Sequence, residues 1–142
     1  MLSDTQGSGR GSMGELERVA EYQTESLPEA CVIQVRGEVD ISNVAQLTAR
    51  IRDALSDGVT SLCLDLYEVT HLDSSGLSAL IATHHTVAQL PRGKLALVLD
   101  PVRLRRIFQL RGLEGIFLIA DSREEALAAL RDPGQPAVRP PA

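Results

Sequence analysis

The chain has 142 residues, of which 44 % are hydrophobic and 23 % are charged, a balance typical of one globular domain with its own core. The formal net charge of −5 offers no attraction to a phosphate backbone, so direct nucleic-acid binding is not expected. No apolar run reaches the roughly 20 residues that cross a bilayer, and the start of the chain lacks a secretory signal, so we expect a cytoplasmic protein with no membrane segment.

The two ends of the chain differ in composition from its middle. Residues 1–14 are rich in Gly and Ser and are predicted to be a disordered tail. Residues 132–142 carry repeated prolines, which cannot continue a helix, and are predicted to be a second tail. Residues 15–131 then form a single domain.

The first half of this domain begins with strands. Two short strands are predicted over 16–23 and 30–36, and Gly37 is expected to end the second. A helix follows from an N-cap at Ser42, because apolar residues then recur at helical spacing up to residue 58. The next strand, over 59–66, is apolar enough to be buried on both faces.

The second half continues the alternation with a helix after residue 76, a strand over 94–99, a helix starting at Asp100, a strand over 115–120 and a final helix opened by a capping box at Ser122. Strands separated by helices imply right-handed crossovers and parallel pairing, while the first two strands can pair antiparallel at one edge. The predicted fold class is α/β, a single domain with a mixed, mostly parallel sheet of about five strands and about four helices.

Two segments that follow strands carry unusual polar residues, in the place where α/β proteins collect functional groups. One is residues 37–43 (GEVDISN), and the other is residues 72–77 (LDSSGL). Plain capping of the following helix by Asp73 or Ser74 is one interpretation of the second segment. Phosphorylation is another, because the glycine after Ser75 leaves room beside the hydroxyl, and a phosphate there would lie near a positive helix end while Asp73 repels it.

Other chemistries have weaker support in the sequence. A serine hydrolase lacks its Gly-x-Ser-x-Gly elbow, and His71 is too close to the serines for a distant base, while His84 is expected to face the core and His85 the solvent. No metal-ligand cluster or phosphate-binding glycine loop occurs, so no metal and no cofactor is predicted. Cys31 and Cys63 lie in apolar runs and are interpreted as buried free thiols, although neighbouring strands leave a redox pair open.

Three motifs in this order, residues 35–40 (VRGEVD), 62–66 (LCLDL) and 72–77 (LDSSGL), resemble those of a STAS domain of the anti-sigma-factor antagonist group, and the similarity covers residues 16–131. The resemblance implies a partner-switching cycle. The unphosphorylated antagonist binds an anti-sigma factor that is also a GHKL-type serine kinase using Mg-ATP, which frees a sigma factor. Phosphorylation releases the antagonist, and a metal-dependent PP2C-type phosphatase restores it, so the chain is a substrate and not an enzyme.

The resemblance also implies roles for particular residues. Ser75, the serine directly before the glycine, matches the phosphorylated position, and Ser74 is the second candidate. The residues expected to bind the partner are Asp40, Ser42, Asn43, Asp73, Ser74, Ser75 and Gly76. Alternative functions are a non-switching scaffold or interaction module, as in stressosomes or lipid-transport complexes, and a serine hydrolase. Four arginines, at 103, 105, 106 and 111, are expected to form a solvated basic face or a docking patch for an acidic partner.

Overall fold

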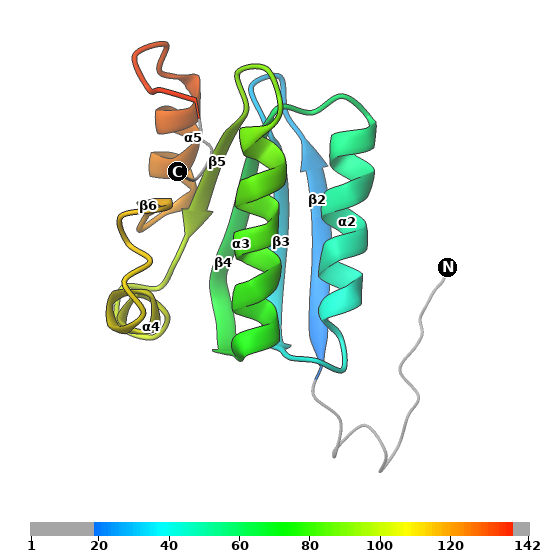
Figure 1. Cartoon of the computed structure of the whole chain (residues 1–142), viewed down its shortest axis with the longest axis vertical. Coiled ribbons are helices and arrows are strands. Elements are labelled where there is room, and N and C mark those ends of the chain that lie inside the picture. The colour runs from blue at the N-terminus through cyan, green and yellow to red at the C-terminus, as the bar shows by residue number, and fades with distance from the viewer. Residues whose placement is uncertain (1–18, 138–142) are drawn as a thin grey trace.

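One five-stranded sheet, with its strands in the order β2-β3-β4-β5-β6, organises the computed structural model, which describes residues 19–137 (Figure 1). β2 pairs antiparallel with β3, and the later pairings are parallel. The elements are, in chain order, β2 (Ala20–Ser26), β3 (Cys31–Val39), α2 (Val44–Ser56), β4 (Ser61–Leu72), α3 (Ser74–Ala88), β5 (Lys94–Val98), α4 (Arg105–Leu110), β6 (Leu118–Ala120) and α5 (Arg123–Arg131).

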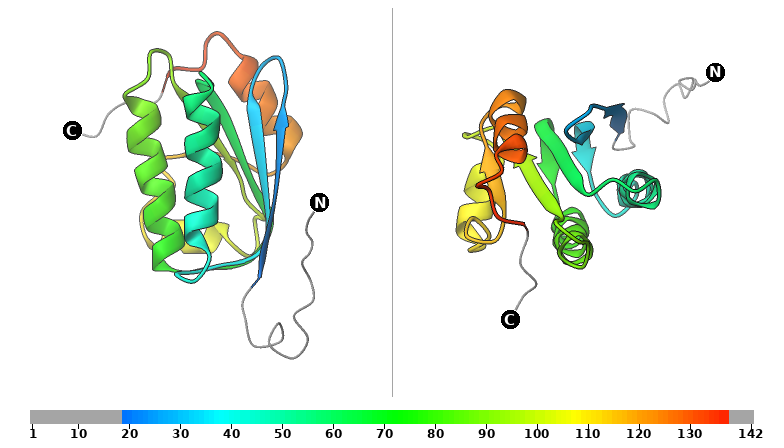
Figure 2. Two further views of the ribbon diagram at one scale, coloured as in Figure 1. Left: turned by 90° about the vertical axis from the view of Figure 1, so that its right-hand side faces the viewer. Right: turned by 90° about the horizontal axis from the view of Figure 1, so that it is seen from above.

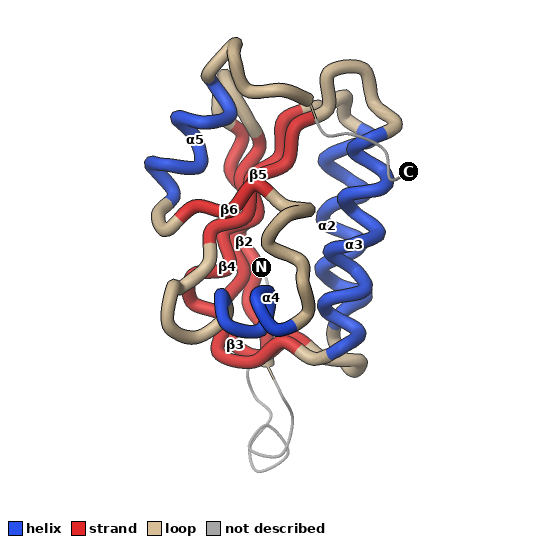
Figure 3. Tube along the Cα trace, turned by 60° about the vertical axis from the view of Figure 1, so that its left-hand side comes forward, coloured by secondary structure: helices blue, strands red, loops and turns tan. Residues whose placement is uncertain are grey.

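The helices cover the two faces of the sheet unequally (Figure 2). Because the order of the parallel strands follows their order in the chain, right-handed crossovers bring α2, α3 and α4 onto one face. α5, which follows the last strand, lies on the opposite face. In Figure 3 the loop that joins α4 to β6 lies between the strands and the α2–α3 pair.

Side chains alternate along the buried strands between two hydrophobic clusters. Cys31, Ile33 and Val35 of β3 belong to the larger cluster, which α2, α3 and α4 cover, whereas Val32 belongs to the smaller cluster beneath α5. In β4, residues 62–66 are all buried, which confirms the prediction of a strand covered on both faces.

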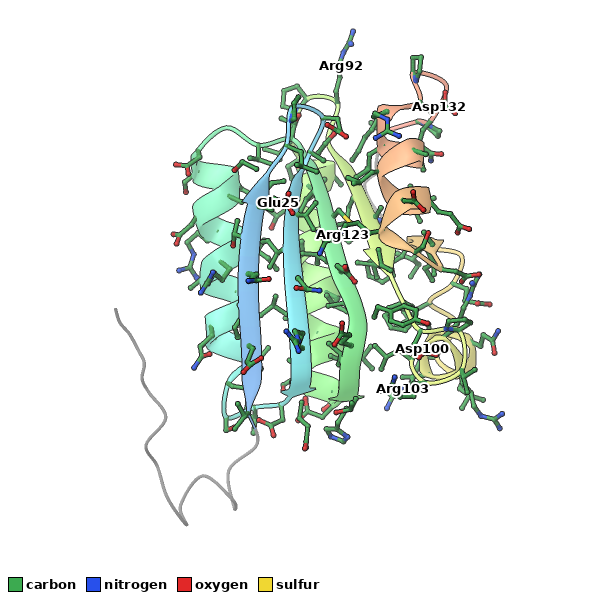
Figure 4. The ribbon with its side chains drawn as sticks, turned by 180° about the vertical axis from the view of Figure 1, so that it is seen from behind. Glu25, Arg92, Asp100, Arg103, Arg123 and Asp132 are labelled. Carbon is green, nitrogen blue, oxygen red and sulfur yellow. The ribbon has the colours of Figure 1, made fainter. Side chains whose placement is uncertain are left out.

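Arg123 connects α5 to the part of the sheet that α5 does not cover (Figure 4). Its guanidinium group pairs with Asp65 of β4 at 3.1 Å and with Glu25 of β2 at 3.1 Å. Asp65 is buried, so this ion pair also supplies the partner that a carboxylate in a low-dielectric site requires. Sequence analysis did not predict this contact between residues 58 positions apart.

The predicted fold class is confirmed, but several boundaries differ. β3 does not end at Gly37, because this residue adopts a φ of +97° and the strand continues through an irregular register to Val39. A Cβ at Gly37 would meet the carbonyl oxygen of Val19, so glycine permits the close approach of Val19, just before β2, to strand β3. β4 extends to Leu72 rather than residue 66.

Two of the predicted helix starts are corrected and a third is confirmed. Asn43, not Ser42, is the N-cap residue of α2. Asp100 does accept from the backbone N–H groups of Val102 and Arg103, at 2.7 and 3.2 Å, but these bonds close a turn and α4 begins at residue 105. Ser122 caps α5 as predicted, and the Glu125 carboxylate accepts from the N–H of Asp121 at 3.1 Å rather than from Ser122.

The two cysteines lie on opposite faces of the sheet. Cys31 is in register with Leu62, so the adjacent Cys63 projects to the other side, and the two residues belong to different core clusters. Both are free and buried, which confirms the interpretation as free thiols and excludes the redox pair.

The predicted N-terminal tail lies outside the described residues, as do residues 138–142 of the C-terminal tail. Residues 132–137 follow α5 without forming a helix or strand. Within residues 19–137, no helix combines the length and the apolar character needed to span a bilayer.

Candidate functional site

Three strand-to-helix segments lie where the parallel strands end, toward the lower end of the molecule in Figure 1. They are residues 40–43 after β3, residues 73–76 after β4 and residues 100–104 after β5, and we call them the carboxyl edge. Both segments in which the sequence predicted partner-binding residues are on this edge. The structure therefore brings together all seven predicted residues, although they differ in exposure.

Asp73 is the N-cap of α3 and holds the start of this helix. Its Oδ1 accepts from the backbone N–H groups of Ser75 and Gly76, at 3.0 and 3.1 Å, and from the hydroxyl of Ser75 at 2.6 Å. The hydrogen bond from the Ser75 side chain is the largest influence that lowers the pKa of Asp73 below its ordinary value, and backbone hydrogen bonds add to it. The carboxylate next to the predicted phosphorylation site is thus firmly ionised at neutral pH.

Asp73 also connects the two polar loops. Its Oδ2 accepts from the backbone N–H of Ile41 at 3.3 Å, and its own N–H donates to the carbonyl of Val39 at 3.3 Å. One carboxylate therefore positions both the hydroxyl of Ser75 and the backbone of the loop after β3.

The loop after β3 is shaped by two buried polar residues. The Asp40 carboxylate accepts from the N–H and the hydroxyl of Ser42, at 2.9 and 2.5 Å. The Asn43 side chain accepts from the N–H of Asp40 at 3.0 Å and donates to the carbonyl of Glu38 at 2.8 Å. Asp40 and Asn43 are each 6 % exposed, so their contribution to a binding surface is to hold the loop, while Ile41 and Ser42 face the solvent.

Exposure decreases along the first turn of α3: Ser74 is exposed, Ser75 is half-buried and Gly76 is buried. A Cβ on Gly76 would meet the side chain of Leu72 and lie 3.3 Å from Val39 Cγ1. The missing side chain therefore allows α3 to approach the ends of β3 and β4 closely, rather than opening space at the surface beside Ser75 as the sequence suggested.

Two apolar side chains on the carboxyl edge were not identified in the sequence. Ile41 is 78 % exposed and Val102 is 82 % exposed, each in a loop directly after a strand. The available signal was an apolar residue within an otherwise polar strand-to-helix loop. Exposed apolar residues next to polar groups are common in surfaces that bind other proteins.

The histidines take no part in this site. His84 is buried and packs edge-on against Phe117, with 5.5 Å between ring centroids, and His85 is exposed, as predicted. Burial lowers the pKa of His84, with a further contribution from His85. The Ser75 hydroxyl donates to Asp73 and not to an imidazole, which is unlike a hydrolase nucleophile. Among residues 19–137 no cluster of His, Cys, Asp or Glu could hold a metal ion.

The predicted arginine patch is divided by ion pairs within the chain. Arg103 pairs with Asp100 at 3.2 Å (Figure 4). Arg105 pairs with Glu114 at 3.1 Å and with Asp121 at 2.7 Å. These two arginines hold the β5–α4 turn and the segment between α4 and β6. Arg106 and Arg111 are exposed beside them.

Comparison with known proteins places this geometry in context. The STAS domain family matches residues 21–126, which include both polar loops of the carboxyl edge. The anti-sigma-F factor antagonist RsfB of Mycobacterium tuberculosis is 32 % identical over 100 residues, which are 70 % of this chain and 80 % of that relative.

Solved structures give the same similarity in three dimensions. An anti-sigma factor antagonist from Mycobacterium paratuberculosis has a TM-score of 0.73 at 29 % identity, over 80 % of this chain and 96 % of the other. The Bacillus cell fate determinant SpoIIAA in its phosphorylated form has a TM-score of 0.62 at 28 % identity, over 78 % of this chain and all of that one. The similarity of the fold thus extends over more than three quarters of this chain.

Proposed function

Since the chain belongs to the family of STAS-domain anti-sigma factor antagonists, we propose that it binds an anti-sigma factor while Ser75 is unmodified and is released when Ser75 is phosphorylated. Membership of this family makes it a regulatory binding protein rather than an enzyme, which removes the serine hydrolase alternative. The observation that carries the proposal is the 2.6 Å hydrogen bond from the Ser75 hydroxyl to Asp73, at the junction of the two polar loops.

Phosphorylation of Ser75 changes this junction in two ways. The phosphoester oxygen has no hydrogen to donate, so the hydrogen bond to Asp73 is lost. The phosphate also brings a charge of about −1.5 to −2 next to an ionised carboxylate. The N–H groups of Ser75 and Gly76 already donate to Asp73, so they offer the phosphate little compensation unless that carboxylate moves.

The size of this effect is sufficient for a switch. A charge placed in an interface without a partner typically costs about 2–4 kcal/mol through repulsion and desolvation, which lowers affinity roughly 30- to 700-fold. We expect Ile41, Ser42 and Ser74 to contact the anti-sigma factor directly, because they are exposed beside Ser75. Asp40, Asn43, Asp73 and Gly76 then support that surface from within.

The proposed partners follow from this cycle. The anti-sigma factor is a GHKL-type serine kinase that uses Mg-ATP to modify Ser75, and a PP2C-type phosphatase removes the phosphate. The chain acts with these proteins in the cytoplasm, where sigma factors work, and contains no cofactor of its own. Two similar proteins support the proposal: SpoIIAA exists in a phosphorylated form, and RsfB is an anti-sigma-F factor antagonist.

Binding of each purified anti-sigma factor of the host to variants at position 75 tests the proposal. Wild type and Ser75→Ala should bind one of them with similar affinity, whereas Ser75→Glu should bind at least about 30-fold more weakly, by the estimate above. Ser78→Glu is the matched control, because Ser78 is exposed on the same helix one turn away from the carboxyl edge. Equal binding by Ser75→Glu and wild type would favour the non-switching scaffold.

A further inference from the structure

An apolar groove of about 510 Å³ lies along α3, away from the carboxyl edge. Its walls are Ile81 of α3, Leu95 of β5, the consecutive residues Ile116, Phe117 and Leu118 just before and at the start of β6, and residues 135–137 after α5. The volume is within the roughly 300–1,000 Å³ typical of sites for small molecules. The groove is therefore large enough to enclose an organic ligand.

The wall formed by residues 116–118 is held in place by the core. Phe117 is 6 % exposed and stacks edge-on with His84 and with Phe108, with ring centroids 5.5 and 5.8 Å away. The N–H of Ile116 donates to the carbonyl of Leu113 at 3.0 Å, which closes the turn before the wall. Ile116 itself is 47 % exposed, so an apolar side chain faces the groove without being covered.

The polar groups at the rim of the groove are basic or neutral. Lys94 and His85 line it, and none of its lining residues is acidic, although the whole chain has 19 acidic residues and a net charge of −5. The ammonium group of Lys94 donates to the backbone carbonyl of Asp132 at 3.1 Å, and within residues 19–137 no carboxylate forms an ion pair with it. It retains further hydrogens for an anionic ligand.

We propose that this groove binds a small amphipathic anion, such as a medium-chain alkyl carboxylate, with its hydrocarbon chain between Ile81, Ile116 and Phe117 and its head group on Lys94. The complementarity is twofold: an apolar surface for the hydrocarbon chain, and for the head group a cation that forms no ion pair within residues 19–137. His85 and Ser75 are ten residues apart in one helix, or about 15 Å along its axis. The site is therefore separate from the carboxyl edge and does not depend on the proposed switch.

Titration of the ¹⁵N-labelled full chain with decanoate, below the concentration at which decanoate forms micelles, tests the proposal. Saturable shifts should appear at the amides of Ile81, Leu95 and Leu118 and not at the carboxyl edge. Lys94→Gln should weaken binding about tenfold, the effect of losing one charge-assisted hydrogen bond. Ile116→Ser should also weaken it, whereas Val102→Ser, which removes a more exposed apolar side chain outside the groove, should not.

Two further ligands separate the contribution of the ligand's hydrocarbon chain from that of its head group. Decanol should bind more weakly than decanoate, and decylammonium should not compete with it. The proposal is overturned if decanoate causes no saturable shift, or if wild type and a folded Lys94→Gln bind it equally. A different result would also overturn the proposal: the protein does not bind decanoate but forms a dimer in sedimentation experiments, and Ile116→Ser abolishes the dimer. The groove would then be the contact surface for a second copy of the protein.

Discussion

At the residue scale, the two oxygens of Asp73 have different tasks. Oδ1 accepts hydrogen bonds from the backbone N–H and the hydroxyl of Ser75 in the first turn of α3. Oδ2 accepts a hydrogen bond from the backbone N–H of Ile41 in the neighbouring loop. A modification of Ser75 therefore alters a group on which two loops depend. This arrangement gives a physical reason for the aspartate that precedes the two serines.

Removal of the Ser75 hydroxyl should raise the pKa of Asp73. The hydrogen bond from this hydroxyl is the largest of the influences that hold the pKa below the ordinary value of 3.8, so Ser75→Ala should shift it upward. Titration of the Asp73 carboxyl carbon by NMR in the two proteins measures the difference.

The same shift has a consequence for stability. A carboxyl group with a lowered pKa in the folded state stabilises the fold above its unfolded pKa, and this contribution is lost as the pH falls through the folded pKa. The stability advantage of wild type over Ser75→Ala should therefore be present at neutral pH and decrease in acid, below the ordinary pKa. A difference in stability that does not change between neutral and acidic pH would contradict the role given to Asp73.

At the element scale, the docking of α3 depends on Gly76. Gly76→Ala should destabilise the fold by about 1–3 kcal/mol, because the added methyl group meets Leu72 and Val39. Ser78→Ala, on the exposed side of the same helix, should instead be neutral or stabilise it by roughly 0.5 kcal/mol through helix propensity. Urea denaturation of both variants measures these changes, and a Gly76→Ala protein as stable as wild type would show that α3 can move away without cost.

The bridge from Arg123 to Asp65 and Glu25 adds to the apolar packing that attaches α5 to the sheet. Arg123→Ala should cost about 1–3 kcal/mol, because it leaves the buried Asp65 carboxylate without its cation. Arg131→Ala, which removes the more exposed pair with Glu29, should cost less than about 1 kcal/mol. If thermal or urea unfolding shows that the two variants lose equal stability, the burial of Asp65 does not make its ion pair the more important one.

The length of a helix or strand could be predicted only where a single sequence pattern continues from its first to its last residue. The buried part of β4 was visible because residues 62–66 are nearly all apolar, but in the last part of the strand exposed residues alternate irregularly with the buried Val69 and Leu72. An irregular register between β3 and β4 also breaks the simple alternation there. Gly37 was taken as a strand end because glycine has the same local preference in a bulge and in a turn.

The candidate site was predictable in position and less so in geometry. Strand-to-helix loops and the motif around Ser75 indicate the edge of the sheet on which the candidate residues lie, because that edge follows from the fold class and the family resemblance. The burial of Asp40 depends on hydrogen bonds between residues two and three positions apart, whose direction no spacing rule specifies. Ile41 was missed because single exposed apolar residues are common on protein surfaces.

At the scale of the whole molecule, the sheet separates the two cysteines and buries both. Burial raises the pKa of the Cys63 thiol to about 12 and also raises that of Cys31. Because the thiolate is the reactive form, iodoacetamide near pH 8 should modify the folded protein very slowly and both thiols after unfolding. Mass spectrometry follows the reaction. Rapid modification of the folded chain, or an internal disulfide after mild oxidation, would contradict the placement on opposite faces.

The length of α3 separates the molecule's two candidate sites. The carboxyl edge at its N-terminal end is proposed to exchange partners, and the groove beside its C-terminal half is proposed to take a small amphipathic anion. Both sites contact the same helix, but they share none of the residues that define them. Their separation means that each can be removed by substitution while the other remains measurable.

The most direct test of the central claim is the mass of the purified protein after incubation with host-cell extract and Mg-ATP, followed by fragmentation to locate the change. The account predicts one phosphoryl group on Ser75 in wild type and none in Ser75→Ala. A known kinase and antagonist pair added to the same extract serves as the positive control. If that pair is phosphorylated while this chain remains unmodified, or carries phosphate only at Ser74 or elsewhere, the proposed switch at Ser75 is wrong.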